Sequence, residues 1–261
     1  MGFLPLRCLI LLPGHACQYS RLGTVDKPLI VRVDFYTMKP PARYPENSQL
    51  TRTIFTAFVF AAAMAYFEAA VVVYLRQSFY PQGFAFPLKP MPAGTLVIEL
   101  GREAATIIML IAVAFLTGKG KWERFGWFLF LFGVWDIGYY FWLKVLIDWP
   151  ATLFDWDILF LIPIPWIGPV VAPVLVSLTM IVIGLWFAVR SRSRNGILVG
   201  SLSWTLGVLG SLVLLYSFMS DTAAGLHGQE PQPYRYWLLA LGLICYWVGF
   251  AVLCRSNPHR M

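Results

Sequence analysis

Ionisable side chains lie inside three successive apolar stretches of this chain. They are Glu68 in the first stretch, Glu99, Arg102 and Glu103 in the second, and Asp136 and Lys144 in the third. A charge in hydrocarbon costs about 2.5–3.5 kcal/mol even on an insertion-based scale. These side chains must therefore face one another or water, and together they form the candidate site of the protein.

The spacing within the second stretch indicates which chemistry this site could support. Glu99, Arg102 and Glu103 are three or four residues apart, so they are neighbours on a helix surface. At 1.5 Å per residue, Glu68 lies at about the same depth as Arg102 and Glu103. One arginine neutralises one carboxylate, and the remaining acid needs Lys144, a proton or a transported cation. The pattern predicts a small transporter or ion-coupled permease with an outward-facing polar cavity.

Two other functions fit the same residues. If the charges close into a network of ion pairs that fixes the helices in register, the protein is a non-catalytic membrane subunit or assembly factor. If Glu68, Glu103 and Asp136 reach a lipid-like substrate, they could act as acids and bases in an intramembrane enzyme. The sequence contains none of the patterns GxxxxGK[ST], HExxH and GxSxG, and its four cysteines form no CxxC pair. We therefore assign no catalytic residue, metal or cofactor.

Composition sets the protein class. The chain has 59% hydrophobic and only 13% charged residues, whereas soluble domains carry about 25% charged residues. The net charge of +7 comes from basic residues in short loops between apolar stretches, which is typical of a membrane protein and not of one that binds nucleic acid. The lipid bilayer is the expected partner.

The apolar stretches predict the fold, since about 20 helical residues cross a bilayer. We expect an all-α membrane protein, a polytopic bundle of six transmembrane helices within residues 51–255. The predicted spans are 54–75, 95–116, 125–146, 167–189, 197–219 and 236–253. Residues 1–50 are expected to form a basic, poorly ordered tail, in which Met38 is an alternative start, and residues 256–261 a C-terminal tail.

The loops predict the orientation. Basic residues recur after the second, fourth and sixth spans, namely Lys119, Lys121, Arg124, Arg190, Arg192, Arg194, Arg255 and Arg260. Because positive loops stay in the cytoplasm, both termini are expected there, in a bacterial-type inner membrane.

Two further segments carry predictions. Leu153–Leu161, between the third and fourth spans, is too short to cross the bilayer and is expected to form an interfacial or re-entrant helix. In the transporter hypothesis this loop is a lid that contains Asp155, Asp157 and Trp166. In the fifth span, Ser203, Gly207 and Ser211 recur at every fourth position, which permits close contact within the bundle, between protomers or with a membrane partner.

Overall fold

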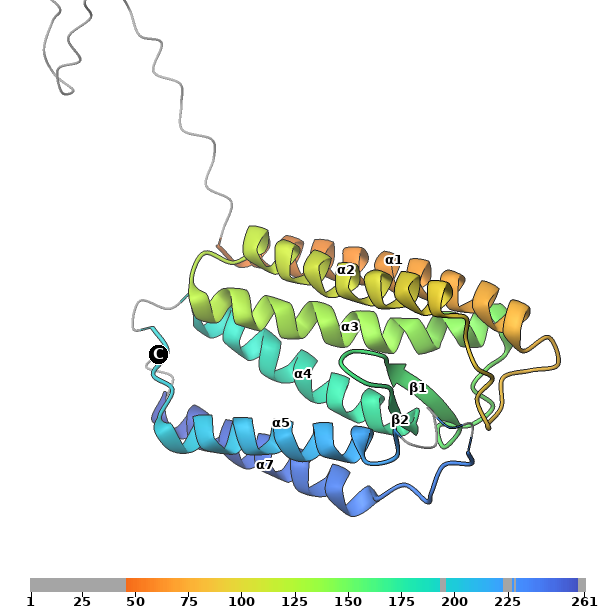
Figure 1. The fold of residues 1–261 in the computed structure, drawn as a ribbon. Coiled ribbons are helices and arrows are strands. Elements are labelled where there is room, and N and C mark those ends of the chain that lie inside the picture. Colours follow the sequence, from red (N-terminus) through yellow and green to blue (C-terminus); the bar gives the residue numbers. More distant parts are fainter. Residues whose placement is uncertain (1–45, 193–195, 223–226, 228, 258–261) are drawn as a thin grey trace, which may run out of the picture. The chain divides into compact units, whose positions relative to one another are not determined.

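The computed structural model describes residues 46–192, 196–222, 227 and 229–257, and the fold in Figure 1 is a bundle of antiparallel helices. The helices are α1 (Glu46–Phe79), α2 (Ala93–Thr117), α3 (Lys121–Ile147), α4 (Val171–Arg190), α5 (Ser201–Met219) and α7 (Tyr236–Ser256). Two short strands, β1 (Trp156–Phe160) and β2 (Trp166–Pro169), lie between α3 and α4 in the chain.

Five of these helices are long and apolar enough to cross a membrane: α1 from Ser48, α3, α4, α5 and α7. Their outward side chains are also apolar, as in Phe67, Tyr74 and Leu212, which are 73%, 68% and 59% exposed. Apolar surface on this scale is unfavourable in water and favourable in lipid. The predicted class of helical membrane protein is therefore supported. The remaining predicted span, the second at 95–116, corresponds to α2, which carries three charges in its first half.

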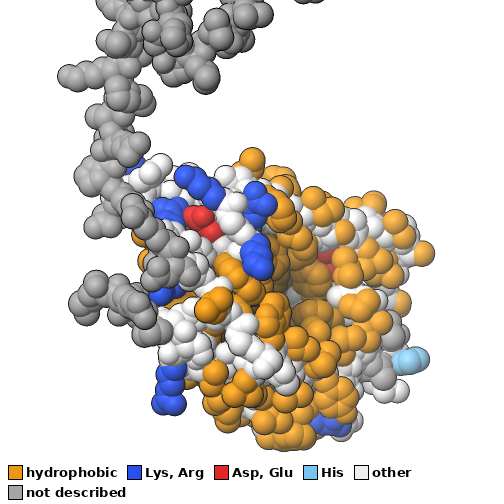
Figure 2. All heavy atoms as spheres, turned by 90° about the vertical axis from the view of Figure 1, so that its left-hand side faces the viewer, with side chains coloured by type: hydrophobic (Ala, Val, Ile, Leu, Met, Phe, Trp, Pro, Cys, Tyr) orange, Lys and Arg blue, Asp and Glu red, His pale blue; other side chains and the backbone are white. Residues whose placement is uncertain are grey.

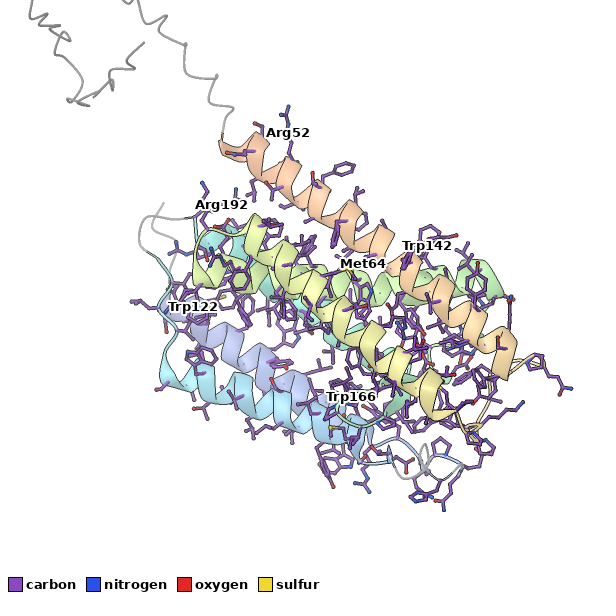
Figure 3. The ribbon with its side chains drawn as sticks, turned by 45° about the horizontal axis from the view of Figure 1, so that its top comes forward. Arg52, Met64, Trp122, Trp142, Trp166 and Arg192 are labelled. Carbon is purple, nitrogen blue, oxygen red and sulfur yellow. The ribbon has the colours of Figure 1, made fainter. Side chains whose placement is uncertain are left out.

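The helices pack in a simple order around α3. Helices α1 and α2 pack against α3, α3 packs against α4, and α5 pairs with α7. The indole of Trp142 on α3 also donates a hydrogen bond of 3.1 Å to the carbonyl of Ala62 on α1 (Figure 3).

Small residues allow the helix backbones to approach closely. A Cβ atom built on Gly184 of α4 would lie 2.6 Å from the carbonyl oxygen of Gly126 and 2.7 Å from the amide nitrogen of Phe130, both on α3. Between α1 and α3, a Cβ on Gly138 would lie 2.8 Å from the Cβ of Ala65, which is fully buried. Packing of this kind replaces the hydrophobic effect, which gives apolar helices no driving force to associate in lipid.

The prediction of a helix at Leu153–Leu161 is wrong, because this segment enters an antiparallel hairpin. Asp157 pairs with Gly168 and Ile158 with Ile167. Pro163 and Pro165 lie in the turn between the two strands; they lack amide donors and disfavour helical conformation in the residues before them. Ile167–Pro169 belong to strand β2 of this hairpin, so α4 begins at Val171 and not at the predicted residue 167.

Two other helix starts differ from the predicted spans. Helix α1 begins at Glu46, eight positions before Ile54 and inside the segment assigned to the tail. Helix α5 begins at Ser201 and not at residue 197. Before it, the side-chain amide of Asn257 bonds both the N–H and the carbonyl of Leu198, each at 2.9 Å, in place of helical partners. Residues 1–45, which include Met38, and Arg194 and Arg260 lie outside the described residues.

We predict that Gly184→Ala destabilises the fold. The new methyl group would meet backbone atoms of α3, which cannot rotate away, so we expect a loss of about 1–3 kcal/mol. Thermal unfolding of the purified protein in detergent, followed by tryptophan fluorescence, measures it. Gly101→Ala on α2 is the matched control, since a Cβ there meets nothing within 4 Å. Equal unfolding midpoints for the two variants would contradict close α3–α4 packing.

Candidate functional site

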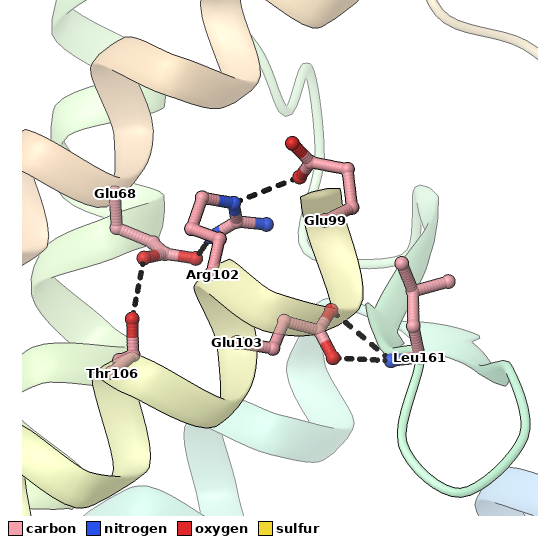
Figure 4. A network of polar contacts seen from close by, with 6 residues as sticks. All are labelled: Glu68, Glu99, Arg102, Glu103, Thr106 and Leu161. Atoms are coloured by element: carbon pink, nitrogen blue, oxygen red, sulfur yellow. Dashed lines mark hydrogen bonds and ion pairs between the residues drawn. The ribbon is translucent and has the colours of Figure 1, made fainter. Parts of the chain in front are cut away.

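One arginine joins two carboxylates at the centre of the site (Figure 4). Arg102 of α2 forms an ion pair with Glu68 of α1 and donates from Nε to Oε2 of Glu99 at 2.8 Å. The hydroxyl of Thr106 donates to the other oxygen of Glu68 at 3.1 Å. Both carboxylates are buried, so the interactions act where water screens them little. The geometry brings Glu68, Glu99 and Arg102 together across two helices.

Glu103 lies beside this group but has a different partner. Its two carboxylate oxygens accept hydrogen bonds of 3.1 and 2.9 Å from the backbone N–H of Leu161, just beyond β1. Glu103 is 10 residues inside α2 from Ala93, which corresponds to about 15 Å along the helix. The tip of the hairpin therefore reaches well into the bundle, where its backbone has to be satisfied by the protein itself.

Asp136 lies on α3 and bonds to α4. The hydroxyl of Ser177 donates to its Oδ2 at 2.8 Å. One turn further along α3, the ring of Tyr139 packs edge-on against that of Tyr140, with 5.0 Å between the ring centres.

The second charged group is a buried ion pair between α1 and the hairpin. Arg76 donates to Asp157 at 2.9 Å, and both side chains are more than 90% buried. The guanidinium lies 3.7 Å from the ring centre of Trp149 and 4.3 Å from that of Phe84, so aromatic faces stabilise its charge. Burial raises the pKa of Asp157 to about 6, although the Arg76 charge opposes this shift. The ion pair between Asp157 and Arg76 holds the hairpin against α1.

The structure does not bring Lys144 into the site. Its ammonium group pairs with Asp148 at 2.7 Å and donates to the carbonyl of Pro150 at 3.1 Å, in an exposed position at the end of α3. The suggestion that Lys144 neutralises the acid left over by Arg102 is wrong in this geometry. The left-handed conformation of Asp148 ends α3 and lets the chain turn so that the last-turn lysine meets it.

The other two residues of the predicted lid stabilise the hairpin locally. Asp155 accepts hydrogen bonds from the N–H of Ala151 and from the N–H and hydroxyl of Thr152. Burial raises the pKa of Asp155, but these bonds outweigh that effect and leave the pKa below its usual value. Trp166 stacks on Phe218 of α5 at 6.1 Å between ring centres. The hairpin contacts Glu103 through the Leu161 amide, and the bonds of Asp155 and the stacking of Trp166 anchor it on the other side.

The partners of the charged residues gave no sequence signal. Thr106 and Ser177 are not the only hydroxyl residues of their helices and do not stand out from them, and Leu161 contributes only its backbone. Arg76 is a basic residue next to the first loop, and nothing in the sequence links it to Asp157. Within the described part of the chain, no group of three or more His, Cys, Asp or Glu residues is arranged to hold a metal ion.

Five apolar helices and a buried cluster of charges define a helical membrane protein with a polar centre. Comparison of the chain with protein-family models, with curated proteins and with solved structures finds no match. The function has to be argued from the site itself.

We predict that Arg76→Gln destabilises the protein more at high pH than at low pH. The raised pKa of Asp157 means that folding binds a proton, so stability falls as pH rises from about 4 to about 6. Loss of Arg76 removes the charge that limits this shift and extends the fall to higher pH. We expect a loss of about 3–5 kcal/mol near pH 8 and a smaller one near pH 5, measured by thermal unfolding.

The double variant Arg76→Gln, Asp157→Asn is the control for this experiment. It leaves no uncompensated charge, so it should regain most of the stability and lose the pH dependence. If Arg76→Gln alone lost the same stability at both pH values, Asp157 would not be the group that causes the pH dependence.

Proposed function

We propose that all six helices cross the membrane, with both termini in the cytoplasm of a bacterial-type cell. Helix α2 has 25 residues and is about 37 Å long, which exceeds the hydrocarbon thickness of about 30 Å. The ends that carry Lys119, Lys121, Arg190, Arg192 and Arg255 gather on one side of the bundle, and Figure 2 looks onto this basic face. Arg52 and Arg192 lie toward this same end in Figure 3.

Cysteine labelling tests this topology. Single cysteines at exposed Lys89 and Ala151 should react with a membrane-impermeant thiol reagent in intact cells, whereas those at exposed Lys119 and Ser256 should react only after lysis. The four native cysteines are first replaced. Labelling of positions 89 and 119 from the same side would show that α2 does not span.

We propose further that the protein is a small proton-coupled membrane carrier. The supporting observation is the charge imbalance around Arg102. Four carboxylates, those of Glu68, Glu99, Glu103 and Asp136, lie in the neighbouring helices, and the second arginine is already paired with Asp157. Three excess charges at membrane depth would cost several kcal/mol. Protons or a bound cation must compensate for them.

The arrangement of the acids favours protons over a metal ion. The acids are held by three separate partners: Glu68 and Glu99 share Arg102, Glu103 bonds to the Leu161 amide, and Asp136 bonds to Ser177. The carboxylates therefore do not converge on one point, as the oxygen ligands of a cation would. Separate acids in a row are the arrangement that proton relays use.

Glu103 is the residue through which protonation would act on the rest of the protein. An ionised carboxylate holds the Leu161 amide with a charge-assisted hydrogen bond, which is roughly twice as strong as a neutral one. Protonation of Glu103 weakens this bond and loosens the hairpin tip. In this mechanism the hairpin opens a path to the acids when Glu103 is protonated and closes it when the proton leaves. Proton coupling requires that the proton and the transported substrate both favour the same conformational change, here the opening of the hairpin.

A second function, that of a structural membrane subunit, has its own support. The contacts among Glu68, Arg102, Glu99 and Thr106 satisfy one another and would also fix α1 against α2. In that case the excess acids are permanently protonated and do not exchange with water.

Infrared spectroscopy of the purified protein distinguishes the two functions. In the Arg76→Gln, Asp157→Asn background, which removes the titration of Asp157, a proton-coupled carrier should show a carboxylic C=O band that grows as pH falls from about 8 to about 5 and shifts in D₂O. Glu103→Gln should remove part of this band in a protein that still folds. The exposed Glu230→Gln is the control and should leave the band unchanged. A band that is constant with pH and insensitive to D₂O would contradict the carrier and favour the structural subunit.

A further inference from the structure

A cavity of about 340 Å³ lies between the α3–α4 pair and the α5–α7 pair, separate from the carboxylates. Its walls are mostly aromatic and aliphatic, with Trp122 and Phe125 of α3, Phe187 of α4, Trp204 of α5 and Phe250 of α7. Its volume is within the range of small-molecule sites, about 300–1,000 Å³. An apolar lining of this kind selects a hydrocarbon occupant.

The cavity is elongated along the helices. Val199, which precedes α5, and Trp122, in the first turn of α3, line it at the basic end of the bundle, and Ser211 and Tyr246 line it further inside. Ser203 and Ser211, both in its wall, are eight residues apart on α5, which corresponds to about 12 Å. This dimension suits an extended chain. Gly207, between the two serines, keeps the wall open, since a Cβ there would meet nothing within 4 Å.

One polar group in this wall lacks a partner. Ser203 is only 9% exposed, and its buried hydroxyl has no hydrogen-bond partner among the described residues. The other hydroxyls of the wall are satisfied: Ser211 bonds to Tyr246 and to the carbonyl of Gly207, and Thr179 bonds to the carbonyl of Leu175. A buried donor without an acceptor costs about 1–3 kcal/mol, so an acceptor on a ligand would stabilise it.

The end of the cavity near Trp122 is positively charged. The ammonium group of Lys121 lies 5.4 Å from the ring centre of Trp122, and Arg255 is in the last turn of α7, two residues after Leu253, which also lines the cavity. Figure 2 shows Lys and Arg side chains gathered on this face of the bundle. Positive charge beside an apolar cavity matches an anionic headgroup that carries a hydrocarbon chain.

We propose that this cavity binds the acyl chain of an anionic phospholipid from the adjoining leaflet. The chain lies along Gly207 toward Tyr246, its ester carbonyl accepts from the Ser203 hydroxyl, and its phosphate meets Lys121. A free phosphate ion would not fill the apolar part, and a neutral lipid would leave the charge unmatched. The proposal is independent of proton coupling, because no residue is shared with the carboxylate cluster.

Native mass spectrometry of the detergent-solubilised full chain tests the proposal. After incubation with phosphatidylglycerol, the wild-type protein should retain one lipid against detergent exchange, with at least about tenfold preference over phosphatidylcholine, equivalent to about 1.4 kcal/mol. Gly207→Leu fills the cavity and should abolish retention. Gly101→Leu is the matched control, because it adds the same side chain at an open position on α2 and should bind like the wild type.

A headgroup variant separates the two parts of the proposal. Lys121→Gln should reduce the preference for phosphatidylglycerol over phosphatidylcholine while chain binding persists. Equal retention by Gly207→Leu and the wild type would overturn the cavity as the site. Equal binding of the two lipids by the wild type would overturn the anionic ligand. If Gly207→Leu does not fold, Ser203→Ala, which removes only the hydroxyl, should weaken retention several-fold, and unchanged retention would also overturn the site.

Discussion

The need to satisfy carboxylates away from water determines how this bundle is built. Arg102 can approach both Glu68 and Glu99 only if α1 and α2 hold those residues at one depth. Glu103 needs a donor that no neighbouring helix supplies, and the Leu161 amide provides it. The hairpin must therefore enter the bundle, and its own charge, Asp157, is in turn paired with Arg76. The arrangement of the first four helices follows from these buried charges.

Helices α1 to α4 pack differently from helices α5 and α7. Helices α1 to α4 combine small-residue contacts, such as Gly184 against Gly126, with buried ion pairs. Helices α5 and α7 have close glycine contacts as well, with Gly210 near the Gly242 carbonyl, but they separate from α3 and α4 around an apolar cavity. Polar chemistry is thus confined to one part of the molecule and apolar space to another. The predicted small-residue stripe at Ser203, Gly207 and Ser211 lines that cavity and faces α7.

Sequence reasoning succeeded where a regular period determines position. Helical rise places Glu68 at the depth of Arg102, and the two side chains do meet. It failed where the partner has no side-chain signature or lies far away in sequence. The Leu161 donor is a backbone amide, which any residue could supply. The short apolar segment Leu153–Leu161 is compatible with either a helix or a strand. Lys144 pairs with Asp148, the residue at the turn after α3, and not with the buried acids. The cavity could not be predicted because it depends on how two helix pairs separate.

The pairing of Arg76 with Asp157 also constrains the order in which the protein can assemble. These residues are 81 positions apart, and three helices are made before the aspartate is synthesised. Until then, the arginine at the end of α1 has only water, headgroups and the rings of nearby aromatic residues as partners. The contacts that fix the hairpin to α1 and α2 therefore form only after Asp157 and Leu161 have been made. The ion pair between Glu68 and Arg102, by contrast, needs only the first two helices.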